Sequence, residues 1–192
     1  MVEEAPRPGS TANWRRSIRL RGFDYGQPGA YFVTICTQGR ACVLSDIVLG
    51  EVYLRPLGEV VDECWRNIPI HFPHVTLDLH VVMPDHIHGI LHFIGRGTPW
   101  RAPTPAQSRA PTPPPWGAPT EAFGRPVRGS LPTVIRAFKS SVTRIVRNHG
   151  FEGRLWQRGY YERVIRNANE LSRVRQYIQL NPHAWDFDEA DA

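Results

Sequence analysis

The order of predicted elements in this sequence indicates an α+β fold with an antiparallel sheet. Four segments have the β-branched and aromatic composition of strands, another has the pattern of a β-hairpin, and three carry apolar residues at helical spacing. Strands and helices do not alternate strictly along the chain, which argues against a doubly wound parallel sheet. We therefore expect a ferredoxin-like arrangement in which the helices pack mainly on one face of the sheet.

The first half of the chain predicts a strand, a hairpin and a helix. The segment 30–37 is rich in β-branched and aromatic residues and follows a turn with glycine and proline, as a central strand would. Two short apolar runs on either side of Gly50 predict a hairpin within 41–54. A helix is predicted over 57–68, where Pro69 ends it. One face of this helix carries its apolar residues, which are Leu57, Val60, Val61, Cys64, Trp65 and Ile68.

The middle of the chain predicts two paired strands and a second helix. The strand segments 75–82 and 87–94 are joined through a Pro-Asp turn at 83–85. The pattern leaves open whether His86 belongs to the turn or begins the second strand. An amphipathic helix is predicted over 131–149, followed by a glycine that can cap it.

The last part of the chain predicts one more strand, over 156–165, and a third helix, over 169–180. An asparagine at the start of this helix can cap it. Pro182 disfavours the α conformation at the residue before it. We therefore expect the helix to end there, with Asn181 as its final residue.

Composition indicates how the domain is organised. The 192 residues suffice for one domain of ordinary size, and 41% apolar residues suffice for its core. Nine of the 18 prolines fall within 96–128, which predicts an extended, solvated insertion. We expect a flexible arm at 1–13, a single domain at 14–185 that this insertion interrupts, and an acidic tail at 186–192.

Charge and cysteine content narrow the function classes. The net charge is +5, and all but one of the 23 basic residues are arginine, which favours an anionic partner such as nucleic acid. Three cysteines without a CxxC pair argue against a disulfide framework or a zinc knuckle and fit a reduced cytoplasmic protein. No apolar run of 18 residues and no signal-like N-terminus occur, so neither a membrane span nor secretion is expected.

Two residue pairs could form a metal-assisted site. His86 and His88 are two apart, and residues i and i+2 of a strand project to the same face, so both imidazoles can bind one ion. Tyr177 and Asn181 are four apart and share a face of the last helix. If that face abuts the histidines, Asn181 can complete the ligands and Tyr177 can offer a hydroxyl. Spacing alone leaves open that these are structural histidines, a core tyrosine and a helix cap.

Three blocks of the sequence resemble one known family. The segment 83–91, with its His-Ile-His core, resembles the HUH motif (His, apolar, His) of the single-tyrosine HUH transposases. The segments 156–167 and 177–182 are similar to the C-terminal signature of the REP-associated tyrosine transposase branch, which 131–144 also matches. The likeness runs from about residue 19 to Pro182, interrupted by the proline-rich insertion, which is not a usual family element.

The resemblance implies an activity and a set of site residues. Such enzymes cleave and rejoin single-stranded DNA when a tyrosine attacks the scissile phosphorus, which leaves a 5′-phosphotyrosine and a free 3′-OH. Carried over to this sequence, 14–185 is the catalytic domain, Tyr177 is the nucleophile and His86 and His88 are catalytic metal ligands, with Asn181 as the third ligand. The implied cofactor is a divalent ion, Mg²⁺ or Mn²⁺, which stabilises the transition state because a phenol is a weak nucleophile near pH 7.

The resemblance also implies single-stranded or hairpin DNA as the partner, a cytoplasmic location with the nucleoid, and a monomer or a homodimer. Basic residues are expected to contact phosphates and aromatic ones to stack on bases. The candidates are Arg15, Arg16, Arg136, Lys139, Arg158, Arg166, Trp156 and Tyr160. For the two aromatic candidates, packing in the core is the alternative, and one of Tyr160 and Tyr161 is expected to face the core.

Two other function classes remain open on the sequence. One is a non-catalytic, domesticated module that binds single-stranded or hairpin DNA on the same scaffold. The other is a metal-dependent hydrolase that uses water in place of tyrosine and forms no covalent adduct. The presence of all four predicted site residues favours the transposase.

Overall fold

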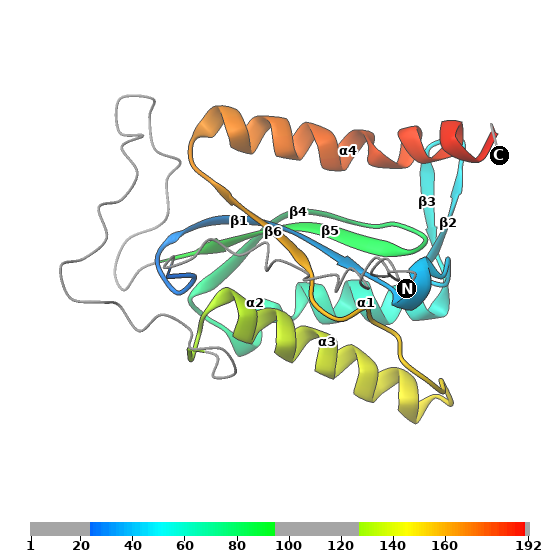
Figure 1. Cartoon of the computed structure of the whole chain (residues 1–192), viewed down its shortest axis with the longest axis horizontal. Coiled ribbons are helices and arrows are strands. Elements are labelled where there is room, and N and C mark those ends of the chain that lie inside the picture. The colour runs from blue at the N-terminus through cyan, green and yellow to red at the C-terminus, as the bar shows by residue number, and fades with distance from the viewer. Residues whose placement is uncertain (1–23, 95–126, 191–192) are drawn as a thin grey trace, which may run out of the picture.

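The structure is a computed structural model that describes residues 24–94 and 127–190. Its elements, in chain order, are β1 (Gly29–Cys36), the 3-10 helix η1 (Gln38–Arg40), β2 (Ser45–Val48), β3 (Glu51–Leu54), α1 (Pro56–Arg66), α2 (Ile68–His71), β4 (Val75–Val82), β5 (His86–Phe93), α3 (Leu131–Asn148), β6 (Tyr161–Ile165) and α4 (Ala168–Ala190) (Figure 1). The predicted arm at 1–13 lies outside the described residues, as does nearly all of the insertion at 96–128, and both stay predictions.

Four strands form one antiparallel sheet in the order β4-β5-β1-β6. With α1 between β1 and β4 and α3 between β5 and β6, this is the βαββαβ order of ferredoxin-like folds, and the predicted fold class is confirmed. The predicted hairpin forms a separate two-stranded sheet of β2 and β3. Its turn residues Leu49 and Gly50 have φ of 54° and 77°, as a two-residue type I′ turn requires.

Helices cover both faces of the sheet unequally. Figure 1 shows α1, α2 and α3 against one face and α4 alone across the other. Strand β1 divides its side chains accordingly. Tyr31, Val33 and Ile35 belong to the larger core with α1 and α3, whereas Ala30 and Phe32 belong to the smaller core under α4. Because both faces are covered, every residue of β5 is buried.

A glycine at position 89 of β5 gives Trp65 of α1 room to reach the sheet. A Cβ on Gly89 would lie 2.2 Å from Cζ2 of Trp65, which is fully buried. We expect Gly89→Ala to lower the free energy of unfolding by about 1–3 kcal/mol through overpacking, as measured by chemical denaturation. Adding Trp65→Phe removes the overlapping ring atoms, so the double variant should lose less than the sum of the two single losses. Strict additivity would contradict this account.

The last helix is longer than predicted. It continues through Pro182 to Ala190, so the prediction that it ends at Asn181 is wrong, and the backbone of 186–190 in the expected tail is helical. A proline inside a helix costs about 3 kcal/mol, so tertiary contacts must outweigh it. Pro182 is buried, and the ring of Trp185 lies 6.0 Å from the ring of His86.

The last strand is shorter than the predicted segment 156–165. Only Tyr161–Ile165 forms β6, and Trp156 makes an isolated bridge with Thr37 instead. Between them, Gly159 has φ of 84°, a left-handed conformation that interrupts an extended strand. None of the helices within the described ranges has the length and hydrophobicity needed to cross a bilayer.

Candidate active site

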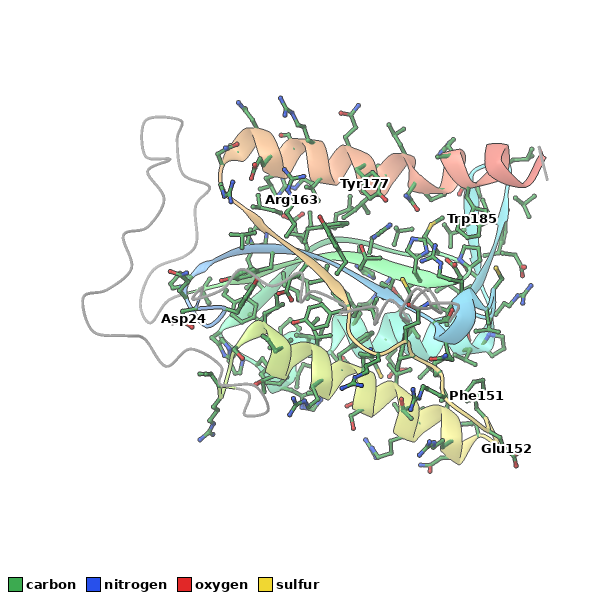
Figure 2. All side chains as sticks on the ribbon, viewed as in Figure 1. Asp24, Phe151, Glu152, Arg163, Tyr177 and Trp185 are labelled. Atoms are coloured by element: carbon green, nitrogen blue, oxygen red, sulfur yellow. The ribbon has the colours of Figure 1, made fainter. Side chains whose placement is uncertain are left out.

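A cavity of about 770 Å³ lies between α4 and the face of the sheet that α4 covers. We call it the α4 cavity. Side chains of β1, η1, β5, β6 and α4 line it, and it contains all four predicted site residues: His86, His88, Tyr177 and Asn181. In Figure 2, Tyr177 lies on the side of α4 that faces the sheet, between Arg163 and Trp185 along the helix.

His86 begins β5 and faces His88 across the cavity floor. Their Nε2 atoms are 2.9 Å apart. The Nδ1 atom of His86 donates to the carboxylate of Asp85 over 2.5 Å, and Nδ1 of His88 bonds the hydroxyl of Thr34 over 2.8 Å. Because a carboxylate only accepts, a neutral His86 carries its proton on Nδ1 and leaves Nε2 free. These outer partners orient both rings with Nε2 toward the cavity, as metal-binding histidines require.

The electrostatic surroundings keep His88 in the form that binds metals. Burial is the main cause that lowers its pKa to about 3, and the neighbouring His86 and Arg40 lower it further. Its imidazole is therefore neutral at pH 7. Asp85 is only 3% exposed and also pairs with Nε of Arg40 over 2.5 Å. The carboxylate thus links Arg40 at the cavity wall to His86.

Tyr177 is held beside the histidine pair by ring contacts. Its hydroxyl lies 3.2 Å from Nε2 of His88. Its ring centroid lies 5.2 Å from that of His88 and 6.0 Å from that of Phe32, the latter edge to face. The residue is nevertheless 49% exposed, so its hydroxyl is open to a ligand in the cavity. Asn181, one turn further along α4, lines the same cavity.

The donor set fits a divalent ion through two nitrogens. Two nitrogen ligands each about 2 Å from one ion must lie within about 4 Å of each other. The Nε2 atoms of His86 and His88 meet this condition. In the described part of the chain, no group of three or more His, Cys, Asp or Glu side chains gathers. Further ligands would have to be oxygens, from Asn181, water or phosphate, as Mg²⁺ and Mn²⁺ prefer.

Several cavity residues were missed by the sequence reasoning. They are Arg40, Tyr161, Arg163, Arg173 and Trp185. Strand alternation places Tyr161 and Arg163 on one face, and helical spacing places Arg173 one turn before Tyr177, so both signals were present. Trp185 was missed because the helix was expected to end before it.

The predicted basic contacts are spread over the molecule. Arg15 and Arg16 lie outside the described residues. Arg136 and Arg166 are exposed and do not line the α4 cavity. Lys139 lies on α3, on the opposite face of the sheet. Its ammonium group donates to the carbonyls of Gln157 and Gly159 over 2.7 and 2.9 Å. Burial lowers the pKa of Lys139 to about 8.

The two aromatic candidates pack in the core. Trp156 is 5% exposed, and its ring lies 5.9 Å from that of Phe138. The prediction that Trp156 stacks on bases is wrong because both faces of its ring are covered. Tyr160 packs against the same core, and it is Tyr161 that lines the α4 cavity.

An ion pair fastens α4 to the sheet. Arg175 donates from Nε and Nη2 to the carboxylate of Asp78 on β4, over 3.0 and 2.6 Å, and Nε2 of His92 bonds the same carboxylate over 2.7 Å. Burial alone would raise the pKa of Asp78, but the hydrogen bonds from Arg175 and His92 outweigh it and hold the pKa below its ordinary value.

We expect Asp78→Asn to lower the free energy of unfolding at pH 7 by about 1–3 kcal/mol, because Arg175 and His92 lose a charged partner. A lowered pKa in the folded state stabilises the protein above the unfolded value, about 3.9. The difference between wild type and variant should therefore vanish as the pH falls through the lowered pKa. Denaturation at several pH values measures it. Asp46→Asn, in the exposed pair with Arg55, is the control and should have a much smaller effect.

No protein-family model matches the chain. A solved structure of a REP-associated tyrosine transposase bound to a REP hairpin superposes with a TM-score of 0.53, covering 83% of this chain and 70% of that chain at 17% identity. The protein therefore has the fold of the REP-associated tyrosine transposases, and the resemblance found in three sequence blocks is confirmed at the level of the fold.

A relative by sequence is an uncharacterised protein of Haemophilus influenzae. The two are 36% identical over 175 residues, which cover 91% of this chain and 92% of the relative. This chain belongs to the same protein family as that Haemophilus protein.

Proposed function

We propose that this protein is a metal-dependent transposase that cleaves and rejoins single-stranded DNA through a 5′-phosphotyrosine intermediate. The observation that carries the proposal is the position of the Tyr177 hydroxyl, 3.2 Å from Nε2 of His88 in an accessible cavity. A core tyrosine would not leave its hydroxyl open to a ligand beside a pair of facing imidazoles.

Each site residue has a role in this proposal. His86 and His88 hold a divalent ion together with Asn181, and the bound ion neutralises charge that develops on the scissile phosphate. The phenolic oxygen of Tyr177 loses its proton and bonds to the phosphorus, while the bond to the 3′ oxygen breaks and that oxygen gains a proton. The covalent link keeps the energy of the phosphodiester, so the reverse attack by a 3′-OH rejoins the strand without a nucleotide cofactor.

The walls of the α4 cavity support an unpaired strand as the substrate. Tyr161 and Trp185 offer aromatic rings for base stacking, and Arg40, Arg163 and Arg173 supply positive charge for the phosphates. We propose hairpin or palindromic elements as the target, since the solved transposase with this fold is bound to a REP hairpin.

The test is an adduct assay with Mn²⁺ and a labelled single-stranded oligonucleotide that carries a hairpin. The proposal predicts an SDS-resistant protein–DNA band together with a released fragment ending in a 3′-OH. Binding without cleavage would replace the proposal with the domesticated DNA-binding module. Cleavage without an adduct would replace it with a hydrolase that uses water.

A further inference from the structure

A second cavity, of about 840 Å³, lies on the opposite face of the sheet from the α4 cavity. The C-terminal half of α3 and the segment 153–158, which leads toward β6, form it, and we call it the α3 groove. Figure 2 labels Phe151 and Glu152 where the chain turns at this end of α3, across the sheet from Tyr177.

The α3 groove is strongly cationic. Its basic lining residues are Lys139, Arg144, Arg147, Arg154 and Arg158. The four arginines are exposed, and across the described ranges none of them forms an ion pair, nor does an acidic side chain line the groove. Lys139 braces the segment through the two carbonyls that it binds. Four unpaired guanidinium groups facing one groove suit a polyanion such as a nucleic-acid backbone.

The lining also indicates which form of nucleic acid fits. The aromatic residue of the α3 groove, Trp156, is covered by the core, so the groove offers no free ring for unpaired bases. The α4 cavity, by contrast, has exposed Tyr161 and Tyr177 and half-buried Trp185. Unpaired strands bind by stacking on such rings, whereas a duplex hides its bases and presents phosphates. The groove therefore matches a duplex and the cavity matches a single strand.

The chain connects the two sites around one edge of the sheet. β6 is an edge strand, next to β1 alone. Arg158, just before it, lines the α3 groove, while Tyr161 and Arg163 on it line the α4 cavity. We propose that the α3 groove binds the phosphate backbone of a double-stranded DNA stem, while the unpaired strand beside the stem passes around the β6 edge into the α4 cavity. The destination of the unpaired strand rests on the proposed function; the stem site does not.

The experiment measures binding of two labelled probes without metal: a blunt hairpin without a single-stranded flank, and an unstructured oligonucleotide without a stem. The triple variant Arg144→Ala/Arg147→Ala/Arg154→Ala should bind the blunt hairpin about tenfold more weakly, and the slope of log Kd against log salt should fall by about 3 as three phosphate contacts are lost. Its affinity for the unstructured oligonucleotide should change less than about twofold. Arg66→Ala, which removes an exposed cation of α1 outside the groove, should change neither affinity.

The outcomes separate this inference from the proposed function. Unchanged hairpin binding in the triple variant, an equal loss on both probes, or no hairpin binding by the wild type would each overturn the stem site. The exposed positions of the three arginines favour a folded variant, and its adduct with the unstructured oligonucleotide should match that of the wild type. If neither protein forms an adduct yet hairpin binding still depends on the groove, the proposed function fails and the stem site stands.

Discussion

Replacing Tyr177 by phenylalanine is expected to abolish the covalent protein–DNA adduct. The change removes the phenolic oxygen but keeps the ring that packs on Phe32 and His88, so the cavity keeps its shape. Because no other group can take over the covalent bond, adduct formation should fall by about a thousandfold or more. DNA affinity, measured by fluorescence anisotropy, should stay within about twofold of the wild type.

Tyr161→Phe is the matched control for this variant. Tyr161 also lines the α4 cavity and is also exposed, but it lies on β6, and its ring lies 6.3 Å from the ring of Phe32. We expect this variant to keep the adduct. An adduct that survives in Tyr177→Phe and disappears in Tyr161→Phe would move the nucleophile from α4 to β6.

Replacing either cavity histidine should remove the effect of the metal on both stability and cleavage. A ligand that binds only the folded protein stabilises it by about 2.7 kcal/mol at a concentration of 100 times its Kd. Mn²⁺ should therefore raise the melting temperature of the wild type, and His86→Gln and His88→Gln should lose this shift together with cleavage. Thermal melts across a Mn²⁺ titration measure the shift.

His92→Gln is the control for the metal site. His92 lies on β5 with the same parity, but its Nε2 bonds Asp78 rather than facing the cavity. This variant should be less stable than the wild type at every Mn²⁺ concentration, because Asp78 loses a partner, yet its shift with Mn²⁺ should be unchanged. A shift that persists in His86→Gln, or one that disappears in His92→Gln, would contradict the assignment of the two histidines.

Local periodicity was sufficient to predict most of the fold. β1, α1 and α3 follow from apolar spacing, and the strand order follows from elements that alternate irregularly. The parity of His86 and His88 placed both on one face of β5, where the structure has them. The rules failed where distant contacts decided the outcome, as at Pro182, where packing beyond the proline keeps α4 helical.

The support of the candidate site could not be predicted from local patterns. Thr34 orients His88 because β1 and β5 pair in a register that sets these two residues opposite each other. Arg40 reaches Asp85 from a turn more than 40 residues earlier in the chain. Such partners depend on register and topology, which a single sequence does not specify. The role of Tyr177 likewise came from the resemblance, since helical spacing alone left it a core residue.

The central claim is that the phenolic oxygen of Tyr177 is the atom that becomes joined to DNA. Trimming the DNA of the adduct with nuclease, digesting the protein with trypsin and sequencing the peptides by tandem mass spectrometry tests it directly. The account predicts a 5′-linked nucleotide on Tyr177, in the C-terminal peptide that begins at Gln176. A nucleotide on Tyr161, in the separate peptide 159–163, or on any other residue would contradict it.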